Sequence, residues 1–363
     1  MRILWGPEHN GLHMDPARPG AYEWWYFDAL SDDGRWAVVA IYFLGTPMSP
    51  YYKATVDGAN PLPRHWCGIF FSLHENTASP GLPPAWVERA YIYNLYRDEI
   101  FGEQGTVSLH DGTGIQPLNR ENSSSWRLTT REAGLWHGMV CAEGTFTQIG
   151  EPLCLNPVGN EQELHTWVCV APLCRVEMKV TLINGKEVSF HGHGYHDHNF
   201  GQLPWDNLTL WYWGQAEVGR HKAIYYVTDF ADATPQECVL LLLDREDREP
   251  PQLYYNLHHA RSSDPVRNGY GLHYERSLSL AALPDAQPGK TGSSFPTLRV
   301  QYLQGGGDFS NGPFYRRAPV TLEAILPEGT VSGTGIGEVF RPSRLCHPLW
   351  SWLMWTRIRR RSL

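Results

Sequence analysis

The sequence predicts an all-β protein built from two antiparallel β-barrels or β-sandwiches. Short runs of alternating apolar and polar residues recur along the chain, and a period of two is typical of half-buried strands. Glycine and proline, 35 and 27 residues respectively, separate these runs as turn residues do. A chain of 363 residues is long enough for two domains of ordinary size. We place these domains at 1–203 and 204–344, followed by a tail over 345–363.

The first half is expected to contain strands and no long helix. Residues 23–30 and 36–44 flank Asp33-Gly34, which predicts a β-hairpin, and a proline-rich loop follows over 45–65. Further strands are predicted at 66–74, 89–96, 105–110, 125–130 and 136–149.

The second half continues the same pattern after a connection near 200–207. Strands are predicted at 208–217, 222–230, 238–243, 277–283, 297–303 and 320–326. Short strands separated by turns through both halves favour two barrels or sandwiches.

Composition excludes several classes of protein. The net charge of −8 argues against a general nucleic-acid binder. The 7 cysteines include no CxxC pair, so neither a disulfide framework nor a thiolate zinc site is indicated. The N-terminus lacks the apolar segment of a secretory signal, which predicts a cytoplasmic protein with reduced thiols. Neither a Rossmann nor a P-loop fingerprint is present, and no cofactor is expected.

The segment 191–201 concentrates four histidines, a tyrosine and an aspartate among glycines, and we interpret it as a functional site. Residues 176–182 alternate as a strand, and Asn184-Gly185 is a strong hairpin signal. With a two-residue turn, Met178 faces His191. The apolar, inward face would then carry four site residues in steps of two, with His196 and His198 on the other side. These four residues are His191, His193, Tyr195 and Asp197.

The preferred chemistry is general acid catalysis by Asp197. Burial of a carboxyl on an apolar face raises its pKa, and a neutral carboxylic acid is a proton donor. Tyr195 could hydrogen-bond Asp197 or help to carry the proton. The alternative is an aspartate that caps the glycine-rich bend.

A second pair, His165 and Trp167, shares one face of a strand-like run just upstream. Trp167 could stabilise a carbocation through its π face, and His165 could orient Asp197 or position a water. Each residue taken alone is more often part of a core. The 15 tryptophans suggest an aromatic pocket. The side chains expected to bind substrate are His191, His193, Trp24, Trp25, Trp211 and Trp213.

A metal site is the competing interpretation of the histidines. His191 and His193 with a carboxylate from another strand would form a facial triad. The same face also carries Tyr195 and Asp197, however, and four groups in a row cannot all reach one ion. We therefore predict no metal, and we expect His196 and His198 to support the bend through hydrogen bonds.

Three motifs resemble those of the carotenoid 1,2-hydratases, also called hydroxyneurosporene synthases. They are Glu23-Trp-Trp-Tyr-Phe-Asp28, His165-x-Trp167 and Gly194-Tyr-His-Asp-His-Asn-x-Gly201. The wider superfamily includes lipocalin-like AttH proteins and fungal decalin-forming Diels–Alderases. Phe200 departs from this pattern, because the hydratases are expected to have tryptophan there.

The resemblance implies two lipocalin-like β domains and cofactor-free addition of water to a terminal isoprenoid double bond. It also implies that Asp197 is the proton donor, assisted by Tyr195, His165 and Trp167. The substrate would be an acyclic isoprenoid or carotenoid that passes through a tertiary carbocation. Alternatives that the residues leave open are an isoprenoid cyclase or isomerase with the same acid, a pericyclase, and a carrier of a hydrophobic ligand.

The tail over 345–363 changes in composition, with three tryptophans beside four arginines. Its apolar part is shorter than the roughly 20 residues of a spanning helix. Such a segment is suited to lie in an anionic membrane interface, which predicts peripheral contact with the inner face of the membrane. The alternative is a last helix packed on the barrel.

Overall fold

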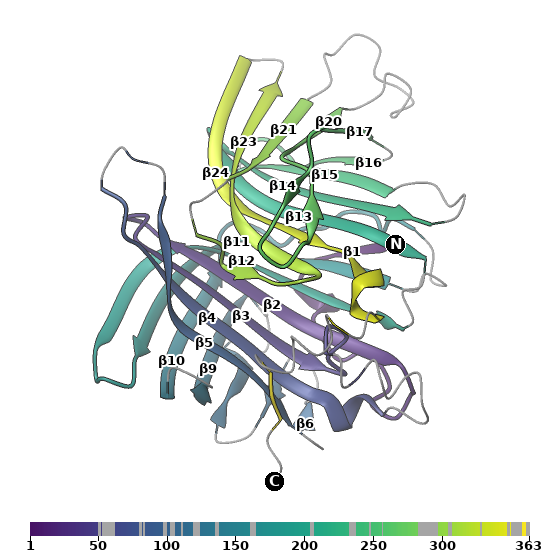
Figure 1. Ribbon diagram of the computed structural model, residues 1–363. Coiled ribbons are helices and arrows are strands. Elements are labelled where there is room, and N and C mark those ends of the chain that lie inside the picture. The colour runs from purple at the N-terminus through teal and green to yellow at the C-terminus, as the bar shows by residue number, and fades with distance from the viewer. Residues whose placement is uncertain are drawn as a thin grey trace. The chain divides into compact units, whose positions relative to one another are not determined.

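Figure 1 shows the computed structural model of the chain. It describes residues 1–49, 52, 62–79, 82, 84–96, 100–101, 106–109, 112–118, 124–134, 138–159, 165–203, 207–231, 237–246, 248–255, 257–281, 297–303, 307–326, 329–346, 349 and 358–360. Strands and turns dominate this part of the chain, together with the short 3-10 helices η1 (Pro7–His9), η2 (Pro63–Trp66) and η4 (Pro342–Cys346). The all-β prediction is confirmed.

The chain divides into two compact units. Unit 1 comprises Met1–Thr77, Val87–Pro204 and Ser351–Leu363, and unit 2 comprises Ala78–Trp86 and Trp205–Trp350. Each unit contains its own sheet and its own buried core.

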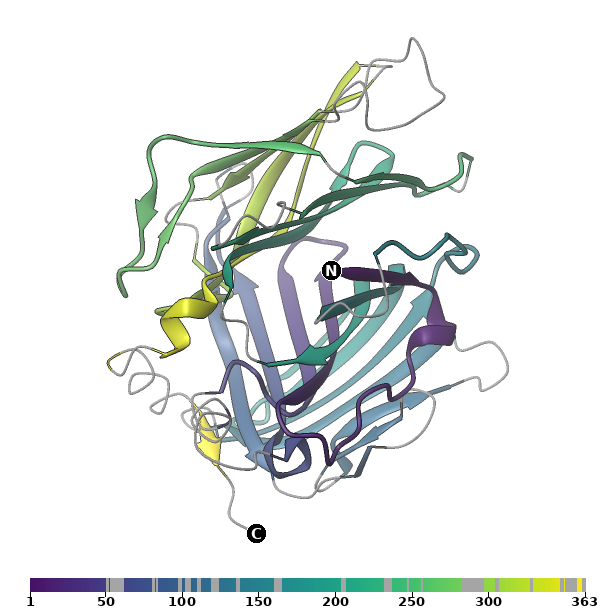
Figure 2. The same ribbon diagram turned by 90° about the vertical axis from the view of Figure 1, so that its right-hand side faces the viewer.

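Unit 1 is built on one large curled sheet (Figure 2). Its strand order is β25-β5-β4-β3-β2-β12-β11-β10-β9-β8-β7-β6, with β1 beside β11. From β4 through to β6 in this order, neighbours pair antiparallel, whereas β1 and β25 pair parallel with β11 and β5. The bounds are β1 (Arg2–Trp5), β2 (Ala21–Ser31), β3 (Trp36–Leu44), β4 (Cys67–Asn76), β5 (Trp86–Tyr96), β6 (Ile100–Phe101), β7 (Val107–Ser108), β8 (Gly114–Pro117), β9 (Ser125–Gly134), β10 (Gly138–Gln148), β11 (His165–Thr181), β12 (Glu187–Gln202) and β25 (Arg359–Arg360).

Unit 2 contains a second sheet with the order β16-β15-β14-β13-β24-β23-β21-β20-β17. β22 pairs with β23, and β18 and β19 pair with each other. The bounds are β13 (Leu208–Val218), β14 (His221–Phe230), β15 (Glu237–Asp244), β16 (Gln252–Tyr255), β17 (His258–Arg261), β18 (Val266–Arg267), β19 (His273–Tyr274), β20 (Ser277–Ala281), β21 (Thr297–Tyr302), β22 (Ser310–Asn311), β23 (Tyr315–Leu326) and β24 (Gly329–Phe340).

The predicted hairpin near the N-terminus is present as β2 and β3. Their register joins Glu23 to Leu44 and Leu30 to Ala37. Gly34 adopts a φ of 67° in the turn, a conformation that glycine adopts without steric cost. β2 lies next to β12, so this hairpin brings residues 21–31 alongside the histidine-rich segment.

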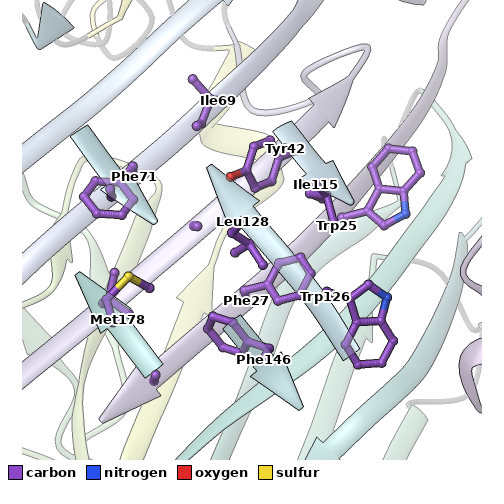
Figure 3. Close-up of a cluster of buried hydrophobic side chains, with 14 of the residues drawn as sticks. Trp25, Phe27, Tyr42, Ile69, Phe71, Ile115, Trp126, Leu128, Phe146 and Met178 are labelled. Atoms are coloured by element: carbon purple, nitrogen blue, oxygen red, sulfur yellow. The ribbon is translucent and has the colours of Figure 1, made fainter. Parts of the chain in front are cut away.

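The core of unit 1 lies on one face of its sheet. Figure 3 shows Trp25 and Phe27 of β2 packed with Trp126, Leu128 and Phe146. β11 and β12 contribute Val176, Met178, Val180, Val188 and Phe190 to the same cluster. We call this side of the sheet the core face.

The sequence prediction assigned the wrong face of β12 to this core. Thr181 pairs with Glu187, and the turn between the strands is longer than the two residues assumed, with Gly185 at a φ of 74°. Glu177 therefore faces His191, and Met178 faces Phe190. A shift of one residue exchanges the two faces of a strand. The core face thus carries His196 and His198, and the opposite face carries His191, His193, Tyr195 and Asp197.

The C-terminal tail is described only in part. Ile358 is buried, and Arg359 and Arg360 pair with Asn94 and Leu95 at the edge of the sheet. Residues 350–357, which contain most of the predicted interfacial segment, lie outside the described residues. In the described part of the chain, no helix is long and apolar enough to cross a membrane.

Candidate active site

The Asp197 carboxyl is the centre of a buried hydrogen-bonded cluster. Its Oδ2 accepts hydrogen bonds from Trp167 Nε1 at 3.1 Å and from the Tyr195 hydroxyl at 2.9 Å. Its Oδ1 accepts a bond from Asn199 Nδ2 at 2.8 Å. Trp167 Nε1 also lies 3.2 Å from the Tyr195 hydroxyl. Three of the four predicted catalytic residues are therefore in direct contact, and Asn199 is a partner that the sequence interpretation missed.

Strand register explains this convergence. Tyr195, Asp197 and Asn199 occupy alternate positions of β12, so they project to one side. Trp167, which lies on β11, pairs with Asn199 and points to the same side of the sheet as Asn199. The pairing of β11 with β12 contains two register shifts between Cys169 and Cys174. The second shift cancels the effect of the first, so the residues before and after this stretch alternate between the two faces in the same phase.

Burial has a strong effect on Tyr195. Removal of the hydroxyl from water raises the pKa of Tyr195 well above its usual value, and negative charge on Asp197 raises it further. Tyr195 therefore stays protonated and donates its hydrogen bond to Asp197 under ordinary conditions. This is consistent with a tyrosine that orients the carboxyl.

His165 lies one side-chain position beyond Trp167 on the same face. Its Nδ1 is 2.9 Å from the Tyr22 hydroxyl, and its ring stacks on Trp24. Burial, with a contribution from the charge of the N-terminus, lowers the pKa of His165 to about 3. The imidazole is therefore neutral at neutral pH and suited to hydrogen bonding of a polar group or water.

Aromatic residues extend this face across neighbouring strands. Tyr22, Trp24 and Tyr26 of β2 lie opposite Gly201, Asn199 and Asp197 respectively. Ring contacts continue from Phe43 to Tyr93 and on to Phe70. All of these side chains are buried. We define the site face as Tyr22, Trp24, Tyr26, Asp28, Phe43, Phe70, Tyr91, Tyr93, His165, Trp167, Tyr195, Asp197 and Asn199.

The predicted substrate-binding residues are distributed over several places. His191 and His193 lie toward the solvent-exposed end of β12, with side chains 65% and 34% exposed. Trp24 belongs to the site face, whereas Trp25 belongs to the core face and donates to the Asn10 carbonyl.

Trp211 and Trp213 are in β13 of unit 2, on the side opposite its core residues Leu210 and Tyr212. Both tryptophans are buried, and Trp211 contacts Tyr226. Their predicted role in substrate binding remains a prediction.

The core face carries the other two histidines of the motif. His196 stacks on Phe27, with ring centroids 3.8 Å apart, and its Nδ1 lies 2.9 Å from the Tyr26 carbonyl. His198 Nε2 lies 2.7 Å from Glu23 Oε1, and its Nδ1 lies 3.2 Å from the His9 carbonyl. Both atoms that face His198 are oxygen acceptors. These contacts fasten the N-terminal segment to β2 and β12.

Within the described residues, no group of three His, Cys, Asp or Glu side chains is arranged to hold an ion. The site face presents carboxyl, hydroxyl, amide and aromatic ring groups.

The fold has solved relatives of the lipocalin-like AttH type. The AttH protein of Nitrosomonas europaea aligns with a TM-score of 0.60 over 92% of this chain and 95% of that chain, at 14% identity. Identity at this level shows the fold alone. The chain thus has the predicted lipocalin-like β architecture.

Sequence comparisons are more specific. Residues 152–263 match the family Carotenoid hydratase CrtC. A hydroxyneurosporene dehydrogenase of Chlorobaculum tepidum is 26% identical over 90% of this chain and 84% of its own length. An acyclic carotenoid 1,2-hydratase of Thiocapsa roseopersicina is 28% identical over 58% of this chain and 51% of its own length. The resemblance to the carotenoid hydratases, predicted from the motifs, is confirmed, and the matched segment includes His165 through Asn199.

Proposed function

We propose that the protein is a hydro-lyase that adds water to a terminal C=C bond of an acyclic isoprenoid or carotenoid. The observation that carries this proposal is the Asp197 cluster, a buried carboxyl held by Trp167, Tyr195 and Asn199 on an aromatic face. Similarity to a family of carotenoid hydratases over the same residues supports the substrate class. The reaction needs a proton donor and a bound water, and side chains of the site face can provide both without a cofactor.

Asp197 is the proposed proton donor. In its neutral form it transfers a proton to the less substituted alkene carbon, so that the π bond breaks and a C–H bond forms. The more substituted carbon becomes a tertiary carbocation, and Asp197 becomes a carboxylate. Its three hydrogen-bond donors then stabilise the new negative charge, which lowers the barrier to protonation.

Aromatic rings stabilise the positive charge of the carbocation. A cation within about 6 Å of a ring centroid is attracted by the ring quadrupole, most strongly by tryptophan. Trp24 and Tyr26 lie across from Asn199 and Asp197, close to where the cation would form. Burial of these rings limits bulk water, so the attacking water has to be held by the protein.

His165 is the proposed holder of that water. Its low pKa keeps the ring neutral, so one nitrogen can accept a hydrogen bond while the other donates. The hydrogen bond with Tyr22 and the stacking on Trp24 fix the ring plane. Addition of the water and loss of its proton give a tertiary alcohol.

Peripheral membrane contact through the tail is proposed from composition. Three tryptophans and four arginines within 345–363 fit an interfacial segment. Removal of residues 347–363 should reduce sedimentation with anionic liposomes, and unchanged sedimentation would refute this proposal.

The test of the proposed function is incubation of wild type and Asp197→Asn with acyclic carotenoids in heavy water, followed by mass spectrometry. Wild type should give a product heavier by one heavy water. Asp197→Asn should lose about 100-fold or more of this activity, as expected for a missing general acid. Full activity in a folded Asp197→Asn variant would refute the assignment. An isomeric product that carries solvent deuterium would instead indicate a cyclase or isomerase. Binding without product would indicate a carrier or a pericyclase.

A further inference from the structure

A second tyrosine–aspartate pair lies on the site face, in the neighbouring strand. The Tyr26 hydroxyl donates to Asp28 Oδ2 at 2.8 Å, just as the Tyr195 hydroxyl donates to Asp197 Oδ2 at 2.9 Å. β2 and β12 are antiparallel, and their register places Tyr26 opposite Asp197 and Asp28 opposite Tyr195. The two pairs are therefore related by a local two-fold axis, and each tyrosine faces the carboxyl of the other pair.

The two carboxyls are near neighbours in a dry environment. Facing residues of antiparallel strands have Cβ atoms about 4.5–5.5 Å apart, and diagonal residues about 7–8 Å apart. The rings of Tyr26 and Tyr195 are in edge contact with centroids 6.1 Å apart. Asp28 is 0% exposed and Asp197 is 4% exposed. Two like charges at this separation, away from water, repel each other.

Hydration requires a proton acceptor as well as a donor. Once Asp197 has protonated the alkene, its three hydrogen-bond donors stabilise it as an anion and reduce its basicity. The water that adds to the cation must still lose a proton. Asp28 accepts a hydrogen bond from the hydroxyl of Tyr26, a site-face residue that lies opposite Asp197 in the strand register.

We propose that Asp28, acting through the Tyr26 hydroxyl, accepts the proton that the attacking water loses. This inference rests on the proposed hydration by Asp197. As the C–O bond forms, the Tyr26 oxygen takes a proton from the water and passes its own proton to the Asp28 carboxylate. The products of the step are the tertiary alcohol, neutral Asp28 and ionised Asp197. Transfer of one proton from Asp28 back to Asp197 restores the starting state.

Product partitioning in heavy water tests this role. Asp28→Asn and Tyr26→Phe are compared with wild type, Asp197→Asn and Glu132→Gln, using an acyclic carotenoid with a terminal isopropylidene group. Glu132 is the matched control, because it is an equally buried carboxyl that accepts a hydrogen bond from Asn94 and lies on the core face. The two readouts are alcohol formed and solvent deuterium found in recovered or isomeric alkene.

In Asp28→Asn and Tyr26→Phe, the cation still forms but returns to alkene by loss of a proton. Alcohol should fall by about 100-fold while deuterium continues to enter the alkene, which is the size expected for a missing general base. Glu132→Gln should change neither readout, and Asp197→Asn should lose both. A purely structural role of Asp28 would lower both readouts in proportion.

A proportional loss in both Asp28→Asn and Tyr26→Phe, or full alcohol formation in either, would overturn the proposal. Tyr26→Phe keeps the ring and its packing, so it decides the question even if Asp28→Asn does not fold. A wild type that forms no alcohol and incorporates no deuterium would refute the proposed function itself, which is a different outcome from altered partitioning.

Discussion

Glu23 and Asp197 are buried carboxyls on opposite faces of adjacent strands, and different kinds of group donate hydrogen bonds to them. Glu23 accepts backbone N–H bonds from His13 and Met14 and faces the His198 ring at 2.7 Å. His198 in turn faces the His9 carbonyl with its other ring nitrogen. Asp197 is held by an indole, a phenol and an amide, which are neutral donors.

We interpret this difference as the one between a structural carboxyl and the proposed proton donor. Glu23 is held by backbone amides and by the His198 ring, which tie it to the N-terminal segment and to β12. Asp197 can change its protonation state without losing a charged partner among these three donors. The segment 191–201 therefore makes structural contacts on the core face and carries a candidate acid on the site face.

Of the changes predicted here, substitution of Glu23 should have the largest effect on stability. Glu23→Gln removes the carboxylate from the fully buried contact with His198, and loss of one member of a buried ion pair costs about 3–5 kcal/mol. The urea concentration at the unfolding midpoint should therefore fall strongly. The activity of the folded fraction should persist, since Glu23 points away from the site face. Glu177→Gln, at a carboxylate that is 70% exposed, is the control. An equal effect of both variants would contradict the assignment.

A smaller effect is expected in the pH dependence of stability, which depends on the buried core-face residue His196. Burial lowers the pKa of His196 to about 3, whereas an unfolded histidine titrates near 6.5. Between these values the unfolded chain binds a proton that the folded chain does not, so the free energy of unfolding should decrease as pH falls from about 7 to about 5. His196→Asn should lower stability at pH 7 but weaken this pH dependence. An unchanged slope, measured by urea unfolding at both pH values, would contradict the buried neutral state.

The smallest effect is expected at the exposed end of β12. His191→Ala and His193→Ala remove solvated side chains, and such changes usually alter stability by about 0.5 kcal/mol or less. Activity should stay within about twofold of wild type, because both side chains lie outside the buried cluster. A large rise in KM for either variant would support the sequence-based assignment of these histidines to substrate binding.

Local sequence signals predicted much of the fold. Alternation and the Asp33-Gly34 turn predicted β2 and β3, and the spacing of two predicted that Tyr195 and Asp197 share a side. The same spacing could have identified Asn199, and also Tyr26 and Asp28 once β2 was placed beside β12. These residues were missed because nothing local in the sequence says which strands are neighbours.

The sequence by itself determined which residues of β12 point the same way, because the alternation of side chains is a property of a single extended strand. Only the tertiary structure decided which side is the core and which strands supply the partners. The deciding features were the longer turn at Gly185, which shifts the register by one residue, and the pairing of β2 with β12 across 170 residues of sequence between Tyr26 and His196. Register and strand order depend on how the whole sheet buries its apolar face, and this is set by contacts far apart in the chain.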